Sequence, residues 1–293
     1  MHAAARRRVW SIAACLMGLA LARAHAAENP DWTTPIDPFR IVGNLYYVGS
    51  RDLASYLVVT PAGDVLINSN LESSVPQIRS SVEKLGFHFK DIKILLISHA
   101  HFDHDAGSAE LKRLTGAKYM VMDGDVAVVE SGGATDFAYS HGRYPSAKVD
   151  RVLHDGDQVR IGETVLVAHK TPGHTRGCTT WTLRIAEAGR PLDVVIVGSW
   201  NVNPGYRLVD RPGHPASYPG IAADYRHTFA LLKQLPCDVF LGAHGAYFGM
   251  LDKLERLRAG QGATVWIDPE GYRAATLERE QAFAAELARQ QQQ

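Results

Sequence analysis

The sequence predicts an α+β fold in which two β-sheets pack face to face and helices cover their outer sides. Three observations support this prediction. Short runs rich in Val, Ile, Leu and Tyr are bounded by Gly, Pro, Asp or Asn, as strands usually are. Amphipathic helical patterns lie between these runs, and the order of strands and then a helix returns in the second half of the chain. No stretch reads as an interdomain linker, so we expect residues 27–293 to form a single domain.

The predicted strands are runs of four to six residues. In chain order they are Leu45–Val48, Ser55–Thr60, Asp64–Asn68, Ile94–Ser98, Lys118–Met122, Val165–His169, Thr179–Arg184, Val194–Gly198 and Val239–Gly242.

Three helices are predicted from apolar residues at helical spacing. The first contains Val75, Ile78, Val82 and Leu85, with Pro76 tolerated near its start. Ala106–Leu114 form the second helix, which Gly116 ends in the position of a C-terminal cap. The third contains Tyr225, Phe229, Leu232 and Leu235.

The composition is that of an ordinary globular protein, with 46% hydrophobic and 21% charged residues. Its 31 basic and 31 acidic side chains balance, whereas nucleic-acid binders normally carry a basic excess, so no nucleic-acid partner is expected. Two cysteines follow the N-terminal segment, Cys178 and Cys237, too few for a disulfide scaffold. In an oxidising compartment they could pair, or both could be buried free thiols.

Residues 1–26 resemble a signal peptide for export to the periplasm. A basic stretch, Arg6–Arg8, precedes the apolar run Val9–Leu21, and small residues at 24 and 26 suit cleavage before Ala27. The run is too short for a comfortable membrane span, which needs roughly 20 residues. The segment ending at Cys15 also resembles a lipoprotein cleavage box, which is the less favoured alternative because the apolar run continues past it.

A cluster of metal-ligating residue types follows the predicted strand Ile94–Ser98. Within six residues, His99–His104 (HAHFDH), three histidines accompany Asp103. Imidazole and carboxylate together suit zinc, and loops that leave buried strands are where sites are commonly built. A lone His or Asp there would be a solvated turn residue, and we interpret Asp105 in that ordinary way, as the cap of the following helix.

The segment HAHFDH resembles the HxHxDH signature of the metallo-β-lactamase superfamily. Thr171–Thr175 (TPGHT) and Gly242–Gly245 (GAHG) resemble that family's two later metal-binding turns, in the family's order. The resemblance implies an αββα sandwich of two mixed sheets, with two zinc ions per chain at one edge. It assigns His99, His101 and His174 to the first zinc, and Asp103, His104 and His244 to the second.

Within this superfamily, Ser199 decides the subclass that the resemblance implies. Most relatives place a bridging Asp at this strand end, or a Cys in other β-lactamase subclasses. A serine there, with His104 as an extra ligand, resembles subclass B3 β-lactamases. Asn68 departs from the family pattern, which often has Asp, but an amide can donate as well as accept hydrogen bonds.

The implied activity is zinc-dependent hydrolysis of the β-lactam ring of penicillins, cephalosporins and carbapenems, which would confer antibiotic resistance. We expect Ser199 and Asn201 to bind the substrate carboxylate, Tyr206 to donate to the developing oxyanion, and Asp103 to orient the attacking water. The alternative for the segment around Asn201 is an ordinary Asn-Pro-Gly turn. Ser131–Pro145 reads as a long loop that could cover the pocket.

The expected partner is therefore a small-molecule β-lactam bound by a monomer, with no membrane association after signal cleavage. A lactone or thioester hydrolase of the same fold is the nearest alternative, because one fold hosts many activities. A non-catalytic periplasmic zinc-binding protein is a further alternative. It is disfavoured because the implied ligand sets leave coordination positions open, whereas structural zinc sites are usually closed.

Overall fold

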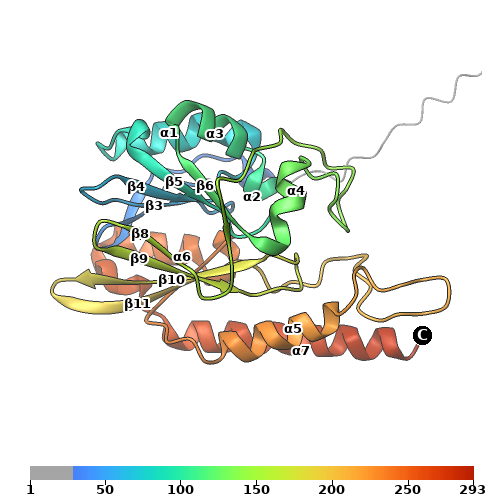
Figure 1. Ribbon diagram of the computed structural model, residues 1–293. Helices are drawn as coiled ribbons and strands as arrows, with labels where there is room; N and C mark the ends of the chain where they lie inside the picture. The colour runs from blue at the N-terminus through green and yellow to red at the C-terminus, as the bar shows by residue number, and fades with distance from the viewer. Residues whose placement is uncertain (1–28) are drawn as a thin grey trace, which may run out of the picture.

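The computed structural model describes residues 29–293, so the predicted signal peptide lies outside the described residues (Figure 1). Seven strands form the first sheet in sequence order. They are β1 (Phe39–Val42), β2 (Leu45–Tyr47), β3 (Tyr56–Val58), β4 (Asp64–Ile67), β5 (Ile92–Leu96), β6 (Lys118–Met122) and β7 (Arg151–Leu153). Neighbours from β1 to β4 are antiparallel and those from β4 to β7 are parallel.

Five strands form the second sheet in the order β12-β11-β10-β9-β8. They are β8 (Gln158–Ile161), β9 (Thr164–Lys170), β10 (Thr179–Glu187), β11 (Arg190–Val197) and β12 (Val239–Gly242). Only the β11–β12 pair is parallel among the pairings described, so this sheet is also mixed.

Helices cover the outer face of each sheet. In Figure 1, α1 (Val75–Lys84) and α3 (Ser108–Thr115) lie above the first sheet, while α5 (Ile221–Leu232) and α7 (Pro269–Gln291) lie below the second. One apolar core fills the space between the sheets and continues under α5 and α7, and a second core separates α1 and α3 from the first sheet. The predicted αββα sandwich is thus confirmed.

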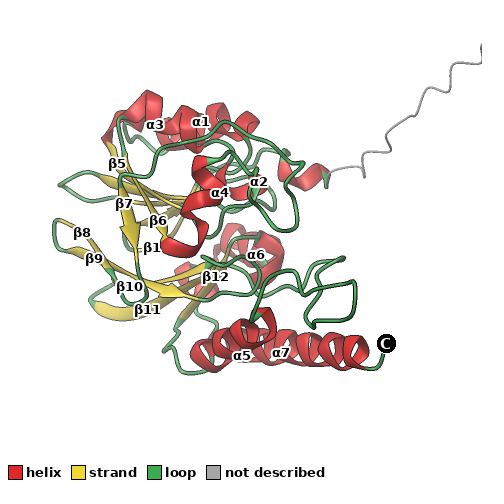
Figure 2. Cartoon of the chain, turned by 45° about the vertical axis from the view of Figure 1, so that its right-hand side comes forward, coloured by secondary structure: helices red, strands yellow, loops and turns green. Residues whose placement is uncertain are grey.

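Shorter helices complete the described chain. They are η1 (Pro30–Trp32), η2 (Glu72–Ser74), η3 (Phe89–Asp91), α2 (Phe102–Asp105), η4 (Asp123–Asp125), α4 (Val126–Glu130), η5 (Gly245–Phe248), α6 (Met250–Arg256), η6 (Leu257–Gln261) and η7 (Ala263–Trp266). Figure 2 shows α2 and α4 close together at one end of the sheets. Across residues 29–293, none of the helices is both long and apolar enough to span a membrane.

Of the two helix caps predicted for α3, the C-terminal one is confirmed and the N-terminal one is wrong. Gly116 ends α3 with φ 74°, the left-handed conformation expected of a C-terminal cap. Asp105 is not the cap of that helix, because Gly107 occupies the N-cap position. Instead, Asp105 ends α2 and its buried carboxylate accepts a hydrogen bond from the Tyr119 hydroxyl.

Both described cysteines are free thiols. Cys178 is fully buried, and its Sγ lies 3.6 Å from the carbonyl oxygen of Ser199, so it donates locally rather than bridging. The sequence left open a disulfide or two buried free thiols; the structure has free thiols, of which Cys178 is buried and Cys237 is partly exposed.

Candidate metal centre

The candidate site is built where several strands end. His99 follows β5, His174 follows β9, Ser199 follows β11 and His244 follows β12. The rigid strands fix where each following turn begins, so residues far apart in the sequence can be held close together.

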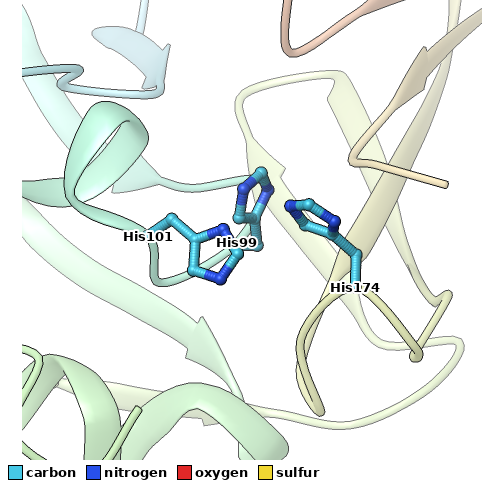
Figure 3. A group of neighbouring side chains, drawn as sticks. All are labelled: His99, His101 and His174. Atoms are coloured by element: carbon cyan, nitrogen blue, oxygen red, sulfur yellow. The ribbon is translucent and has the colours of Figure 1, made fainter. Parts of the chain in front are cut away.

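Three histidines from two segments form a first group. Each of His99, His101 and His174 offers a nitrogen within 4.8 Å of those of the other two, and all three side chains are buried. Their ring centroids are 4.6 to 4.7 Å apart. Figure 3 shows the three rings converging, with His174 approaching from the opposite segment.

A second group lies beside the first. The Nε2 atoms of His104 and His244 are 3.1 Å apart. Asp103 Oδ2 lies 3.3 Å from the former nitrogen and 3.6 Å from the latter. His99 borders both groups, because it also lies within 4.8 Å of Asp103 and His104.

Acceptors elsewhere in the chain orient several of these rings. His174 donates from Nδ1 to the carbonyl oxygen of Asn201, at 2.9 Å. His244 donates from Nδ1 to Asp52 Oδ2, also at 2.9 Å. A ring nitrogen that is held in this way leaves the other nitrogen directed at the group, which is how metal-binding histidines are usually fixed.

The electrostatics of the first group favour neutral imidazoles, and those of the second favour an ionised Asp103. Burial and the neighbouring rings hold the pKa of His99 and His174 well below the usual range, and burial lowers the pKa of His101 to about 4. Burial opposes ionisation of Asp103, but His104 and His244 outweigh it and lower the pKa of that carboxyl. Burial lowers the pKa of His244, but the hydrogen bond to Asp52 outweighs this effect, so the pKa of His244 is raised.

The donor chemistry fits zinc. Nitrogen from neutral imidazole and oxygen from carboxylate are ligands that zinc prefers, and ligands must be deprotonated to bind it. The His104 and His244 Nε2 atoms face each other at 3.1 Å, a spacing that a shared proton or a bound cation can bridge. The six residues expected from the sequence could therefore hold one cation in each group.

Asp52 is a site residue that the sequence analysis missed. Its Oδ2 also accepts from Trp32 Nε1 at 3.2 Å, and its Oδ1 accepts from the Ala246 amide at 3.0 Å. It lies 192 positions from His244, and nothing in its local sequence distinguishes it from a turn residue.

Replacing Asp52 by alanine should weaken zinc binding about 10- to 100-fold, because loss of a partner that orients a metal-binding His costs that much. Competition with a chromogenic chelator would measure the affinity. Asp31→Ala is the matched control, since within residues 29–293 the exposed Asp31 carboxylate pairs only with Arg51, and its loss should leave zinc affinity unchanged. Equal affinity in Asp52→Ala and wild type would contradict the role given to Asp52.

Asp125 joins the two metal-binding segments and was also missed. Its Oδ2 accepts from the Ala100 amide at 2.9 Å and from Thr175 Oγ1 at 2.8 Å, and its Oδ1 accepts from the Gly177 amide at 2.8 Å. Burial raises the pKa of Asp125 to about 6, and these three donors oppose that rise. The carboxylate thus ties the turn around His101 to the turn around His174.

Asn68 supports the same region with both ends of its amide. Its Oδ1 accepts from the Ser98 amide at 2.7 Å, and its Nδ2 donates to the Ala54 carbonyl at 3.2 Å. The residue has φ 68°, a left-handed conformation that Asn tolerates better than most side chains. Its two-sided bonding explains how Asn can support the metal loop in place of Asp.

The residues expected to contact substrate surround the metal groups. Ser199 Oγ lies 3.1 Å from the hydroxyl of Tyr247, and Asn201 Nδ2 donates to that same hydroxyl at 3.1 Å. The Tyr206 hydroxyl donates to the His174 carbonyl at 2.8 Å and lies 3.5 Å from His101 Nε2. Tyr206 would have to exchange its present acceptor to donate to a substrate.

The predicted loop Ser131–Pro145 lies against the first group. Asp136 Oδ2 is 3.5 Å from His101 Nε2, and the ring of Tyr139 lies 4.9 Å from that of His101. Tyr139 also accepts a hydrogen bond from Asn203 Nδ2 at 2.8 Å, which links the loop to the segment after β11.

Comparison with known proteins gives a matching family and similar solved structures. A family model described as the metallo-beta-lactamase superfamily matches residues 51–244. Native FEZ-1 metallo-beta-lactamase from Legionella gormanii is 52% identical, with a TM-score of 0.85, over 88% of this chain and 98% of that one. The class B3 di-zinc metallo-beta-lactamase LRA-12 from an Alaskan soil metagenome is 35% identical, with a TM-score of 0.79, over 89% and 97%.

A curated relative of different activity matches a smaller part. A hydroxyacylglutathione hydrolase of Methylobacterium sp. is 31% identical over 121 residues, which are 40% of this chain and 41% of that protein. The chain thus spans about two fifths of that relative's length.

Proposed function

The chain belongs to the metallo-beta-lactamase superfamily, and on that premise we propose that it is a zinc-dependent β-lactamase of subclass B3. Its family, its His-rich candidate metal site and its structural neighbours among B3 β-lactamases make it a hydrolase. Its proposed reaction is cleavage of the β-lactam ring.

One observation supports this proposal most directly. Two groups of donor atoms lie side by side, and His104 completes the second group in the place of a carboxylate after β11. The residue at that strand end is Ser199, whose hydroxyl is a poor zinc ligand and is engaged with Tyr247 at 3.1 Å. His104 Nε2 and Asp103 Oδ2 lie 3.3 Å apart and would hold the second zinc together with His244.

The residues of the chain would divide the chemistry between them. Zinc lowers the pKa of a bound water towards about 7 and polarises a carbonyl oxygen. Asp103 would orient the attacking water, because its buried carboxylate can accept a hydrogen bond and lies within 4.8 Å of both His99 and His104. Ser199 and Asn201 would bind the substrate carboxylate, and Tyr206 would donate near the developing oxyanion.

We further propose that residues 1–26 direct export to the periplasm, where cell-wall-directed β-lactams act, and that the protein confers antibiotic resistance there as a monomer. Their basic stretch and apolar run support this proposal.

Assay of the purified protein with a chromogenic cephalosporin and a carbapenem, with and without a chelator, tests the proposal. We expect turnover of both substrates, loss of activity with the chelator, and recovery when zinc is restored, because the activated water depends on the metal. Turnover that survives complete zinc removal would contradict a metal-dependent mechanism.

Absence of β-lactam turnover with two zinc ions bound would instead favour a thioester hydrolase. The similarity to a hydroxyacylglutathione hydrolase gives that alternative its support. Assay with a glutathione thioester, using the same zinc-loaded sample, distinguishes the two activities.

A further inference from the structure

Tyr247 connects the residues proposed to bind substrate, although the sequence analysis did not single it out. The tyrosine is in η5, the turn that begins directly after His244. Its amide donates to the His244 carbonyl at 3.1 Å, and its ring centroid lies 5.1 Å from that of His244. In a 3₁₀ turn, residues three apart stand above one another, so this position sets the phenol beside a proposed metal ligand.

The packing around the ring holds the phenol in one place. A Cβ atom at Gly242 would come within 2.8 Å of the Tyr247 ring, so the glycine allows the ring to lie directly on the end of β12. The ring of Trp200 lies 5.7 Å away on another side. Tyr247 as a whole is half-buried, and Ser199 and Asn201 hold its hydroxyl in place.

With the Asn201 amide oriented so that its Nδ2 faces Tyr247, the hydroxyl pair has one donor to spare. Asn201 Nδ2 already donates to the Tyr247 oxygen at 3.1 Å, and one hydrogen is enough for the 3.1 Å contact between the Tyr247 and Ser199 hydroxyls. Each hydroxyl carries one hydrogen, so the second remains free, whichever residue holds it. A free donor in a partly buried site matches an anionic acceptor, with which hydrogen bonds are strongest.

Asn201 extends the connection to the metal centre. Its backbone carbonyl accepts from His174 Nδ1 at 2.9 Å and from the Tyr225 hydroxyl at 2.6 Å, so its main chain is fixed. Its side chain is held by the phenol of Tyr247. Loss of that phenol would therefore release the Asn201 amide while leaving its backbone in place.

We propose that Tyr247 is a specificity-determining residue that selects substrates with a carboxylate, by positioning Ser199 and Asn201 and by leaving one hydroxyl hydrogen free for that carboxylate. This inference rests on the proposed β-lactamase function. It assigns carboxylate recognition to three neutral groups, Ser199, Asn201 and Tyr247, acting as one unit.

The test compares a cephalosporin with its carboxylate ester in wild type and in Tyr247→Phe. For the free acid, we expect the variant to raise KM about tenfold while kcat stays within about twofold, because Ser199 and Asn201 lose the hydroxyl that positions them for the carboxylate. For the ester, both parameters should match the wild type. The zinc content should stay the same as in wild type, as measured by elemental analysis.

Two further variants separate a specific role from a structural one. Tyr272→Phe is the matched control, because it removes another inward hydroxyl, which donates at 2.7 Å to the carbonyl oxygen of Leu232 at the end of α5. It should leave KM unchanged for both substrates. The double variant Tyr247→Phe with Asn201→Ala should raise KM for the acid less than the product of the two single effects, because residues of one network couple.

Binding of the ring-opened acid product, measured by calorimetry, provides a reading that does not depend on turnover and should weaken about tenfold in Tyr247→Phe. An unchanged KM for the acid, or equal losses for acid and ester, would overturn the role of Tyr247 and leave the β-lactamase function standing. Failure of the zinc-loaded wild type to hydrolyse the acid would overturn both.

Discussion

Replacement of His244 by alanine should remove about one of the two expected zinc ions and lower kcat/KM for a cephalosporin by about two to three orders of magnitude. The loss follows from the several kcal/mol that a metal supplies to transition-state stabilisation. The geometry predicts the metal loss, because His104 Nε2 and Asp103 Oδ2 would then lack their third partner, which lies 3.1 Å from the former. Elemental analysis of the dialysed variant gives the zinc count, and steady-state kinetics give the rate.

His174→Ala should likewise cost about one zinc ion, from the first group. Ser199→Ala is the contrasting variant, because its hydroxyl is expected to bind substrate and not metal. It should keep about two zinc ions while activity falls. Two zinc ions retained in both histidine variants would refute the ligand assignment, and a zinc ion lost in Ser199→Ala would make Ser199 a ligand.

Replacement of Asp125 by alanine should lower the free energy of unfolding by roughly 3 kcal/mol, because two buried amides and one buried hydroxyl would lose their acceptor. The bonds involved are 2.8 to 2.9 Å long and join segments that flank the metal groups. Urea denaturation, with the midpoint and slope fitted together, would measure the change.

Asp123 provides the control for that measurement because it lies in the same short turn, η4, but is partly exposed and pairs with Lys170. Asp123→Ala should change stability by no more than about 1 kcal/mol, as is usual for exposed ion pairs. The loss of stability in Asp125→Asn should lie between those of Asp125→Ala and Asp123→Ala, since the amide keeps one acceptor oxygen. A loss below about 1 kcal/mol in Asp125→Ala would mean that the turns are held by other contacts.

Elements with a strong local pattern could be predicted from the sequence. The strand Lys118–Met122 has the predicted bounds. Helix α1 ends at Lys84, so it contains the predicted apolar residues except Leu85, which is its C-cap. The strand before the metal segment lies two residues earlier than predicted, at Ile92–Leu96, because Ile97 and Ser98 lead out of the sheet. Local apolar runs do not reveal where pairing with a neighbour stops.

The elements that were missed have weak local signals. β8 is an edge strand, Gln158–Ile161, with only alternate residues buried. β1 and β7 are also edge strands of three or four residues. Helix α7 spans 23 residues, but it buries Thr276 and Gln290 on the same side as its aromatic residues, which hides its apolar face from a pattern search.

The residues of the candidate site also differ in how strong a signal they leave in the local sequence. Residues within the motif around His99 are close in sequence and could be recognised together. Asp52, Asp125 and Tyr247 depend on tertiary contacts, and two of them are single acidic residues in turns, which sequence reading treats as solvated. Only Tyr247 had a usable signal, because it lies three residues after His244 at the start of a turn.

The contact between His104 and His244 joins positions 140 residues apart: His104 lies in α2 after β5 of the first sheet, and His244 follows β12 of the second. Its two nitrogens meet only when both halves of the chain have docked, so a cation held there would act as a reversible cross-link between the sheets. Binding to the folded state alone adds about 2.7 kcal/mol of stability when the free ion is at a hundred times its dissociation constant. Zinc supply would then affect the stability of the folded protein as well as its chemistry.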